Sequence, residues 1–176
     1  MNKITVCNNK SCLGKIANNM MILALCMAIC MVSQPSYIAH AAGSDMKSLC
    51  SEVLKVTGNK NKLKYKSEKA TDFAGFSIAD CKKVSSIMYV CDDKEVYSLC
   101  VAKAKNAKGA SKLLKSLKSY KKANANSDYL SDYSKQEQKV LKNSVCGKKG
   151  SYVWYIAMSG SKSVNKKGQS ALKNKI

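Results

Sequence analysis

The sequence contains no arginine, and all 31 of its basic residues are lysines. Arginine carries the planar, forked donor group that grips phosphates and base edges with two hydrogen bonds, whereas lysine acts as a point charge. This absence argues against a protein that reads a specific nucleic-acid sequence. The lysine excess is either functional or a result of coding bias, because lysine and asparagine are abundant together, as an AT-rich genome would give.

Histidine is almost absent too. The one histidine, His40, lies in an N-terminal segment that we expect to be removed. The remaining chain then lacks Ser–His and Cys–His nucleophilic pairs, histidine-containing zinc sites and arginine clamps for phosphoryl groups. We therefore predict no catalytic residue, no metal and no cofactor. A hydrolase that uses only carboxylates, such as Asp93 and Glu95, is the remaining enzymatic alternative.

Acidic residues are few: there are 11, and all of them follow residue 42. The first 42 residues carry three lysines, so the rest of the chain has a formal net charge of +17, against +20 for the whole. Outside a cell, the natural counter-charges for such a chain are anionic wall polymers and membrane headgroups.

Residues 1–42 have the three parts of a secretory signal peptide. Lysines precede an apolar run of 13 residues, Met20 to Val32, and Ala39-His40-Ala41 resembles a cleavage site. The run is short for a membrane-spanning helix, which needs about 20 residues. We predict cleavage after Ala41 or Ala42 and a secreted or cell-surface protein. An uncleaved membrane anchor is the first alternative, and lipidation at Cys26 or Cys30 is the second.

Five cysteines follow the segment expected to be removed: Cys50, Cys81, Cys91, Cys100 and Cys146. An odd number leaves at least one thiol unpaired, and the sequence has no Cys-x-x-Cys motif. All five lie in apolar contexts, where free cysteine behaves as a small hydrophobic residue. Buried free thiols are favoured, and disulfide pairing stays open.

Hydrophobic periodicity predicts an α+β domain with a small antiparallel sheet built from two β-hairpins, an amphipathic helix between them and an N-terminal helix. The first hairpin occupies 86–105, with its turn centred on Asp93 and Lys94, its second strand starting at Glu95, and Cys100 opposite Ile87. The helices are expected on one face of the sheet. The other predicted elements are a helix from Met46 to Val56, a short helix over 77–84, the amphipathic helix after Asn106, a helix after Ser134, and a hairpin over 144–158.

The predicted organisation has four parts. They are the signal peptide (1–42), the N-terminal helix with a lysine-rich connector (43–70), the α+β domain (71–160) and a tail rich in lysine, serine and asparagine (161–176). The tail is expected to be frayed or weakly helical.

The run from Phe73 to Met158 resembles a family of uncharacterised bacterial proteins, domain of unknown function 4358. The resemblance rests on Glu95-Val-Tyr-Ser-Leu-Cys-Val-Ala-Lys-Ala, a helix of the Leu113-Leu-Lys-Ser-Leu117 kind, an aromatic loop around Tyr129 and Tyr133, and Lys149-Gly-Ser-Tyr-Val153. It implies an exported, often lipid-anchored protein of Gram-positive bacteria. It implies no catalytic residue, because the family has no established activity. This chain departs from the family in its cysteine count and in lacking a clean lipidation site.

The candidate binding residues are Glu95, Tyr129, Tyr133, Tyr152 and Trp154. Glu95 is expected to accept a hydrogen bond from the backbone or from a lysine. The aromatic residues form either a surface for sugars or peptides or part of the core, since aromatics dominate small cores.

The function expected from these features is binding at the cell envelope through a strongly basic surface. The expected partner is an anionic wall polymer, a membrane surface or another envelope protein, without specific nucleic-acid binding. The alternative is a protein-interaction module that uses the Tyr/Trp-rich strand.

Overall fold

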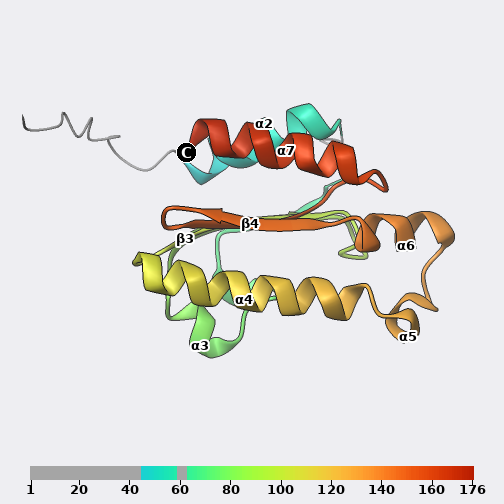
Figure 1. Ribbon diagram of the computed structural model, residues 1–176, viewed down its shortest axis with the longest axis horizontal. Helices are drawn as coiled ribbons and strands as arrows, with labels where there is room; N and C mark the ends of the chain where they lie inside the picture. Colours follow the sequence, from blue (N-terminus) through green and yellow to red (C-terminus); the bar gives the residue numbers. More distant parts are fainter. Residues whose placement is uncertain (1–44, 59–62) are drawn as a thin grey trace, which may run out of the picture. The chain divides into compact units, whose positions relative to one another are not determined.

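The described residues form one five-stranded antiparallel sheet with helices on both faces (Figure 1). The computed structural model describes residues 45–58 and 63–176. The strands are β1 (Tyr65–Ser67), β2 (Val84–Cys91), β3 (Ser98–Ala104), β4 (Val145–Lys149) and β5 (Tyr152–Ala157), in the order β1-β2-β3-β5-β4. The helices are α2 (Met46–Thr57), α3 (Ile78–Cys81), α4 (Ala107–Asn124), α5 (Ser127–Leu130), α6 (Lys135–Lys142) and α7 (Lys162–Lys175), with a short 3-10 helix at Ala70–Asp72.

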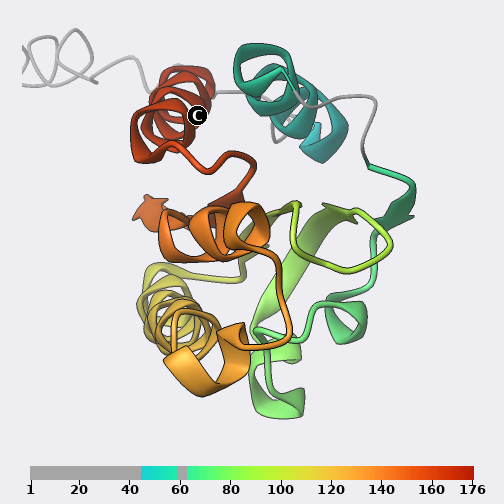
Figure 2. The ribbon, with the colours of Figure 1, turned by 90° about the vertical axis from the view of Figure 1, so that its right-hand side faces the viewer.

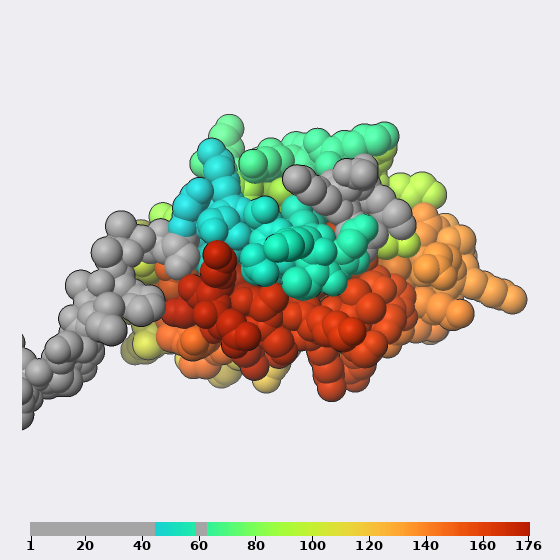
Figure 3. Space-filling model, turned by 90° about the horizontal axis from the view of Figure 1, so that it is seen from above, coloured from blue at the N-terminus to red at the C-terminus, as the bar shows by residue number. Residues whose placement is uncertain are grey.

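This architecture confirms the predicted α+β class, the two hairpins and the amphipathic helix between them. The expectation that the helices share one face is wrong. Helices α2 and α7 cover one face of the sheet, and α4 covers the other (Figures 1 and 2). The space-filling view shows α2 and α7 side by side (Figure 3).

Side-chain alternation along the central strands explains why both faces are covered. Successive residues of a strand point to opposite faces. On β3, Cys100 belongs to the same core cluster as Leu113 of α4, whereas Leu99 and Val101 belong to the cluster that contains the buried residues of α2. A strand that is apolar on both faces is stable only between two layers, which is why helices cover both faces of β3.

The connector and the tail are parts of this fold rather than flanking segments. Strand β1 lies within the lysine-rich connector and pairs with β2 at the edge of the sheet. The tail forms α7, whose Leu172 is fully buried. Residues 45–58 and 63–176 belong to one compact unit. The predicted signal peptide lies outside the described residues.

The first hairpin has a longer loop than predicted. Residues 92–97 connect the strands, so β3 begins at Ser98, and Cys100 lies opposite Tyr89 instead of Ile87. Ile78, at the start of the short helix α3, is left 79% exposed by the fold.

Helix α6 begins at a capping box that the sequence predicts. The Glu137 backbone N–H donates to the Ser134 hydroxyl (3.3 Å), and the Glu137 carboxylate accepts from the Ser134 backbone N–H (2.8 Å). Hydrogen bonds with Ser134, joined by one from Lys94, lower the pKa of Glu137 from 4.5 to about 2. Because the folded-state pKa is depressed, the stabilisation is present above pH 4.5 and is lost as the pH falls toward 2.

The substitution Ser134→Ala is expected to raise the pKa of Glu137 toward 4.5, because it removes the largest cause of the depression. NMR titration of the Glu137 side-chain carboxyl group measures this directly. Lys94→Gln is the matched comparison and is expected to give a smaller rise. An unperturbed pKa for Glu137 in the parent protein would contradict the account of this cap.

Candidate functional site

One end of the sheet gathers lysines from several elements. Here β2 begins, β3 ends and α4 starts, since Val84 pairs with Ala104 and α4 begins at Ala107. The backbone N–H of Lys105 donates to the carbonyl of Lys83 (2.9 Å), which fixes the two segments relative to each other. The β4–β5 hairpin turns at this end as well, because Lys103 of β3 pairs with Tyr152 of β5.

These elements surround a hollow of about 250 Å³ that we call the lysine hollow. It is lined by Lys82, Lys83, Lys105, Asn106, Lys108, Gly109 and Lys112. The β4–β5 hairpin adds Lys148, whose ammonium donates to Ser111 of α4 (3.2 Å), and Lys149, whose ammonium donates to the carbonyl of Lys173 (2.6 Å). We call the lysines of the hollow together with Lys148 and Lys149 the basic end.

Carboxylates compensate little of this charge. Of the four ion pairs among the described residues, one uses a lysine of the basic end, Lys83 with Asp80 (2.8 Å). The other three pairs use Lys47, Lys64 and Lys94. The start of α4 adds the positive end of a helix dipole, although the Asn106 side chain already accepts from the Gly109 N–H (2.8 Å). The arrangement therefore produces a concentrated positive potential on the protein surface.

The sequence held a signal for this site that its overall composition does not reveal. Two long stretches, 96–127 and 138–176, contain lysines and no acidic residue. The first stretch contains α4, and the second contains the β4–β5 hairpin. The positions of the carboxylates, more than the number of lysines, thus indicate where unpaired charge collects.

The opposite end of the sheet holds the predicted site residue Glu95. It lies in the loop between β2 and β3, and its φ of 56° falls in the left-handed region that non-glycine residues rarely adopt. Its carboxylate accepts a hydrogen bond from the Tyr89 hydroxyl (3.2 Å). The expected backbone or lysine donor is therefore replaced by a tyrosine, and the residue does not head a strand.

The predicted tyrosine pair lies near this loop. The Tyr133 hydroxyl donates to the Tyr129 hydroxyl (3.0 Å), and Tyr129 is 46% exposed. The hydrogen bond with Tyr133, then burial, raises the pKa of Tyr129 to about 12, and the Glu95 charge adds to the rise. Glu95, Tyr129 and Tyr133 thus come together at one end of the molecule.

Tyr152 and Trp154 do not join them. Trp154 is fully buried on the α2 and α7 face, where its indole N–H donates to Gln169 (3.3 Å). Tyr152 is buried at the basic end, with the Lys103 ammonium 5.4 Å from its ring centroid. Of the two alternatives for the aromatic residues, a binding surface or part of the core, Tyr152 and Trp154 follow the second.

Neither a metal site nor a disulfide is found in the described part of the chain. No group of three or more metal-ligating side chains is assembled there, and all five cysteines are free. Burial raises the pKa of the Cys50 thiol to about 12 and that of Cys100 well above its ordinary value. Such thiols are poor nucleophiles, because the thiolate is the reactive form.

No helix within 45–58 or 63–176 is long and apolar enough to cross a membrane.

Comparison with known protein families, curated proteins and solved structures finds no match. The resemblance to domain of unknown function 4358 therefore stays a prediction, and the residues themselves carry the functional argument.

Proposed function

We propose that this protein binds an anionic polymer of the cell envelope through its basic end. The observation that carries the proposal is the lysine hollow. Five lysines meet there, from the residues that follow α3, the residue that follows β3, and α4, and one of the five forms an ion pair. Lysine ammonium groups suit a polymer with repeated phosphates or carboxylates, because they contribute charge without demanding a fixed planar geometry. The protein is then a non-enzymatic binding module.

The proposed location is outside the cell. It rests on the signal-like residues 1–42, with cleavage after Ala41 or Ala42, and on the resemblance to exported proteins. An uncleaved N-terminal anchor is the alternative, and it also places the domain at the envelope. Mass measurement of the exported protein separates the two, since a chain that still begins near Met1 contradicts cleavage.

The alternative module based on the Tyr/Trp-rich strand receives less support, because Trp154 is fully buried. The carboxylate-only hydrolase is also less well supported. Asp93 pairs with Lys64 (2.7 Å), and Glu95 accepts from Tyr89, so both carboxylates have structural partners.

Retention on purified cell walls is expected to fall steeply as salt rises from about 0.1 M to about 1 M, because the screening length shrinks from about 10 Å to about 3 Å. A sedimentation assay with walls, and with soluble poly(glycerol phosphate) as competitor, measures this retention. Walls stripped of their anionic polymer are the control and should retain little protein. Retention that does not change with salt would contradict the electrostatic basis of the proposal.

A further inference from the structure

Strand β4 forms one edge of the sheet. In the order β1-β2-β3-β5-β4 it pairs with β5 on one side, and no other strand of the described residues pairs with it. Figure 2 shows this margin of the sheet between the layer of α4 and the layer of α7. A strand in this position carries a row of backbone N–H and C=O groups that no neighbouring strand satisfies.

The hydrogen-bond register of the sheet decides which residues of β4 carry these groups. The Ala104 N–H donates to the Ser151 carbonyl (2.8 Å), so Ser151 bonds toward β3 and the next residue, Tyr152, bonds toward β4. Tyr152 pairs with Lys149, which therefore bonds to β5. Backbone bonding alternates from side to side along a strand, so every second residue of β4 bonds to β5 and the residues between them face outward.

The outward-facing residues of β4 are Cys146 and Lys148. Within 45–58 and 63–176, no backbone hydrogen bond joins either of them to a residue beyond β5. Side chains leave this edge open, because the Lys148 ammonium reaches Ser111 on the α4 face (3.2 Å) and the Lys149 ammonium reaches the Lys173 carbonyl on the α7 face (2.6 Å). An extended chain can therefore pair along β4.

The surroundings of this edge are basic. The segments that form and flank it, 96–127 and 138–176, contain no aspartate or glutamate. Burial raises the pKa of the Cys146 thiol, and the charges of Lys121 and Lys118 on α4 oppose the rise, so both lysines lie near the edge. Lys148 adds a third charge from the strand itself. None of the three forms an ion pair in the part of the chain that the structure describes.

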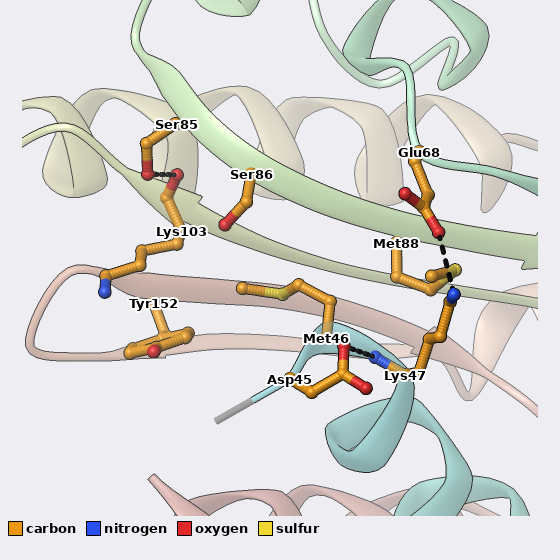
Figure 4. Close-up of a pocket in the computed structure, with 9 residues that line it drawn as sticks. All are labelled: Asp45, Met46, Lys47, Glu68, Ser85, Ser86, Met88, Lys103 and Tyr152. Atoms are coloured by element: carbon orange, nitrogen blue, oxygen red, sulfur yellow. Dashed lines mark hydrogen bonds and ion pairs between the residues drawn. The ribbon is translucent and has the colours of Figure 1, made fainter. Parts of the chain in front are cut away.

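The opposite edge of the sheet has a different charge. Strand β1 is three residues long, and Glu68, directly after it, pairs with Lys47 (3.7 Å; Figure 4). The Asp72 carboxylate accepts hydrogen bonds from the hydroxyls of Tyr65 (2.8 Å) and Ser67 (2.6 Å) of β1. An acidic strand would meet like charges at β1 and opposite charges at β4.

We infer that the edge of β4 binds an extended, acidic segment of another protein as an additional strand. Hydrogen bonds to the backbone of Cys146 and Lys148 hold the segment, and its carboxylates pair with Lys118, Lys121 and Lys148. A second copy of this chain fits less well, because pairing two β4 strands would bring like-charged lysines together. The edge shares Lys148 with the basic end, but it shares no residue with the lysine hollow.

Amide hydrogen exchange, followed by NMR on the full chain, tests this inference with a short blocked peptide in which glutamate and valine alternate. In the free protein, the amides of Cys146 and Lys148 are expected to exchange at least about tenfold faster than those of Val145 and Gly147. The peptide should slow exchange at Cys146 and Lys148 about tenfold. The same peptide N-methylated along its backbone keeps its charge but cannot pair as a strand, so it should protect neither amide.

Two substitutions at one position separate the backbone contribution from the charge. Lys148→Gln removes the charge, whereas Lys148→Pro removes the charge and the outward N–H, a position where an edge strand tolerates proline. Calorimetry with the acidic peptide is expected to show affinity losses of about fivefold and about fiftyfold. Lys135→Gln on α6 is the control and should leave the affinity unchanged.

The exchange experiment on the parent protein decides the inference even if Lys148→Pro weakens the fold. Slow exchange at Cys146 and Lys148 in the free protein would overturn it, because the edge would then be covered. Protection that rises with protein concentration in the absence of peptide would overturn it in favour of a second copy. Equal binding of the N-methylated peptide would show that charge alone attracts the acidic segment, which also contradicts strand addition.

Discussion

Replacing Asn165 with leucine is expected to lower the free energy of unfolding by about 3 kcal/mol. Asn165 is fully buried at the start of α7. Its side-chain oxygen accepts from the Met158 N–H (3.0 Å), and its amide donates to the carbonyls of Asn143 (2.9 Å) and Ser159 (2.8 Å). Leucine would remove all three hydrogen bonds from a buried position.

Denaturant unfolding, followed by circular dichroism, measures this change. Asn174→Leu is the matched control, because Asn174 is exposed on the same helix. Substitutions at exposed positions usually change stability by less than about 0.5 kcal/mol. Equal stabilities for the two variants would mean that α7 does not anchor the domain through Asn165.

Local signals predicted the elements whose ends carry side-chain caps. Asp45 caps α2, Asn106 caps α4, and Ser134 forms the capping box of α6. Each of these interactions spans only two or three residues, so a short stretch of sequence contains both partners. The two hairpins were predicted because their strands are rich in β-branched and aromatic residues.

The missed elements depend on tertiary contacts that local sequence does not reveal. Strand β1 is three residues long and polar, and it is formed by pairing with β2. Helix α7, expected only as a frayed or weakly helical tail, has few apolar residues and is buried through Asn165, Gly168 and Leu172. A Cβ at Gly168 would lie 3.0 Å from Thr57 and 3.1 Å from Val53, so the glycine permits close approach to α2.

The sequence predicted a strongly basic surface, but it did not predict where on the fold the lysines would gather. Composition gave the lysine excess, whereas only the fold shows that the start of α4 and the turn of β4–β5 meet at one end of the sheet. Glu95 and the tyrosines 129 and 133 come together at the opposite end, which their separation in sequence could not indicate. The sequence left Trp154 open between a binding surface and the core, because aromatic residues serve in both, and the fold places it in the core.

Reversing three charges at the lysine hollow, with Lys82→Glu, Lys108→Glu and Lys112→Glu combined, is expected to lower the affinity for an anionic polymer about a hundredfold. Each lysine near an anionic surface contributes about 1 kcal/mol, and about 1.4 kcal/mol corresponds to a tenfold change. All three side chains are exposed, so the fold should tolerate the changes.

The control variant carries the same three charge reversals at the opposite end of the molecule, at Lys135, Lys142 and Lys162. It has the same net charge and the same substitution chemistry as the hollow variant. Because the total charge is the same, any difference in polymer affinity between the two variants depends on where the charges lie.

The most direct measurement is the affinity of the parent protein and of both variants for soluble poly(glycerol phosphate), determined by calorimetry at low ionic strength. The account predicts a loss of about a hundredfold for the hollow variant and a much smaller loss for the control variant. Equal losses in the two variants would contradict it, because binding would then follow net charge and would not require the lysine hollow.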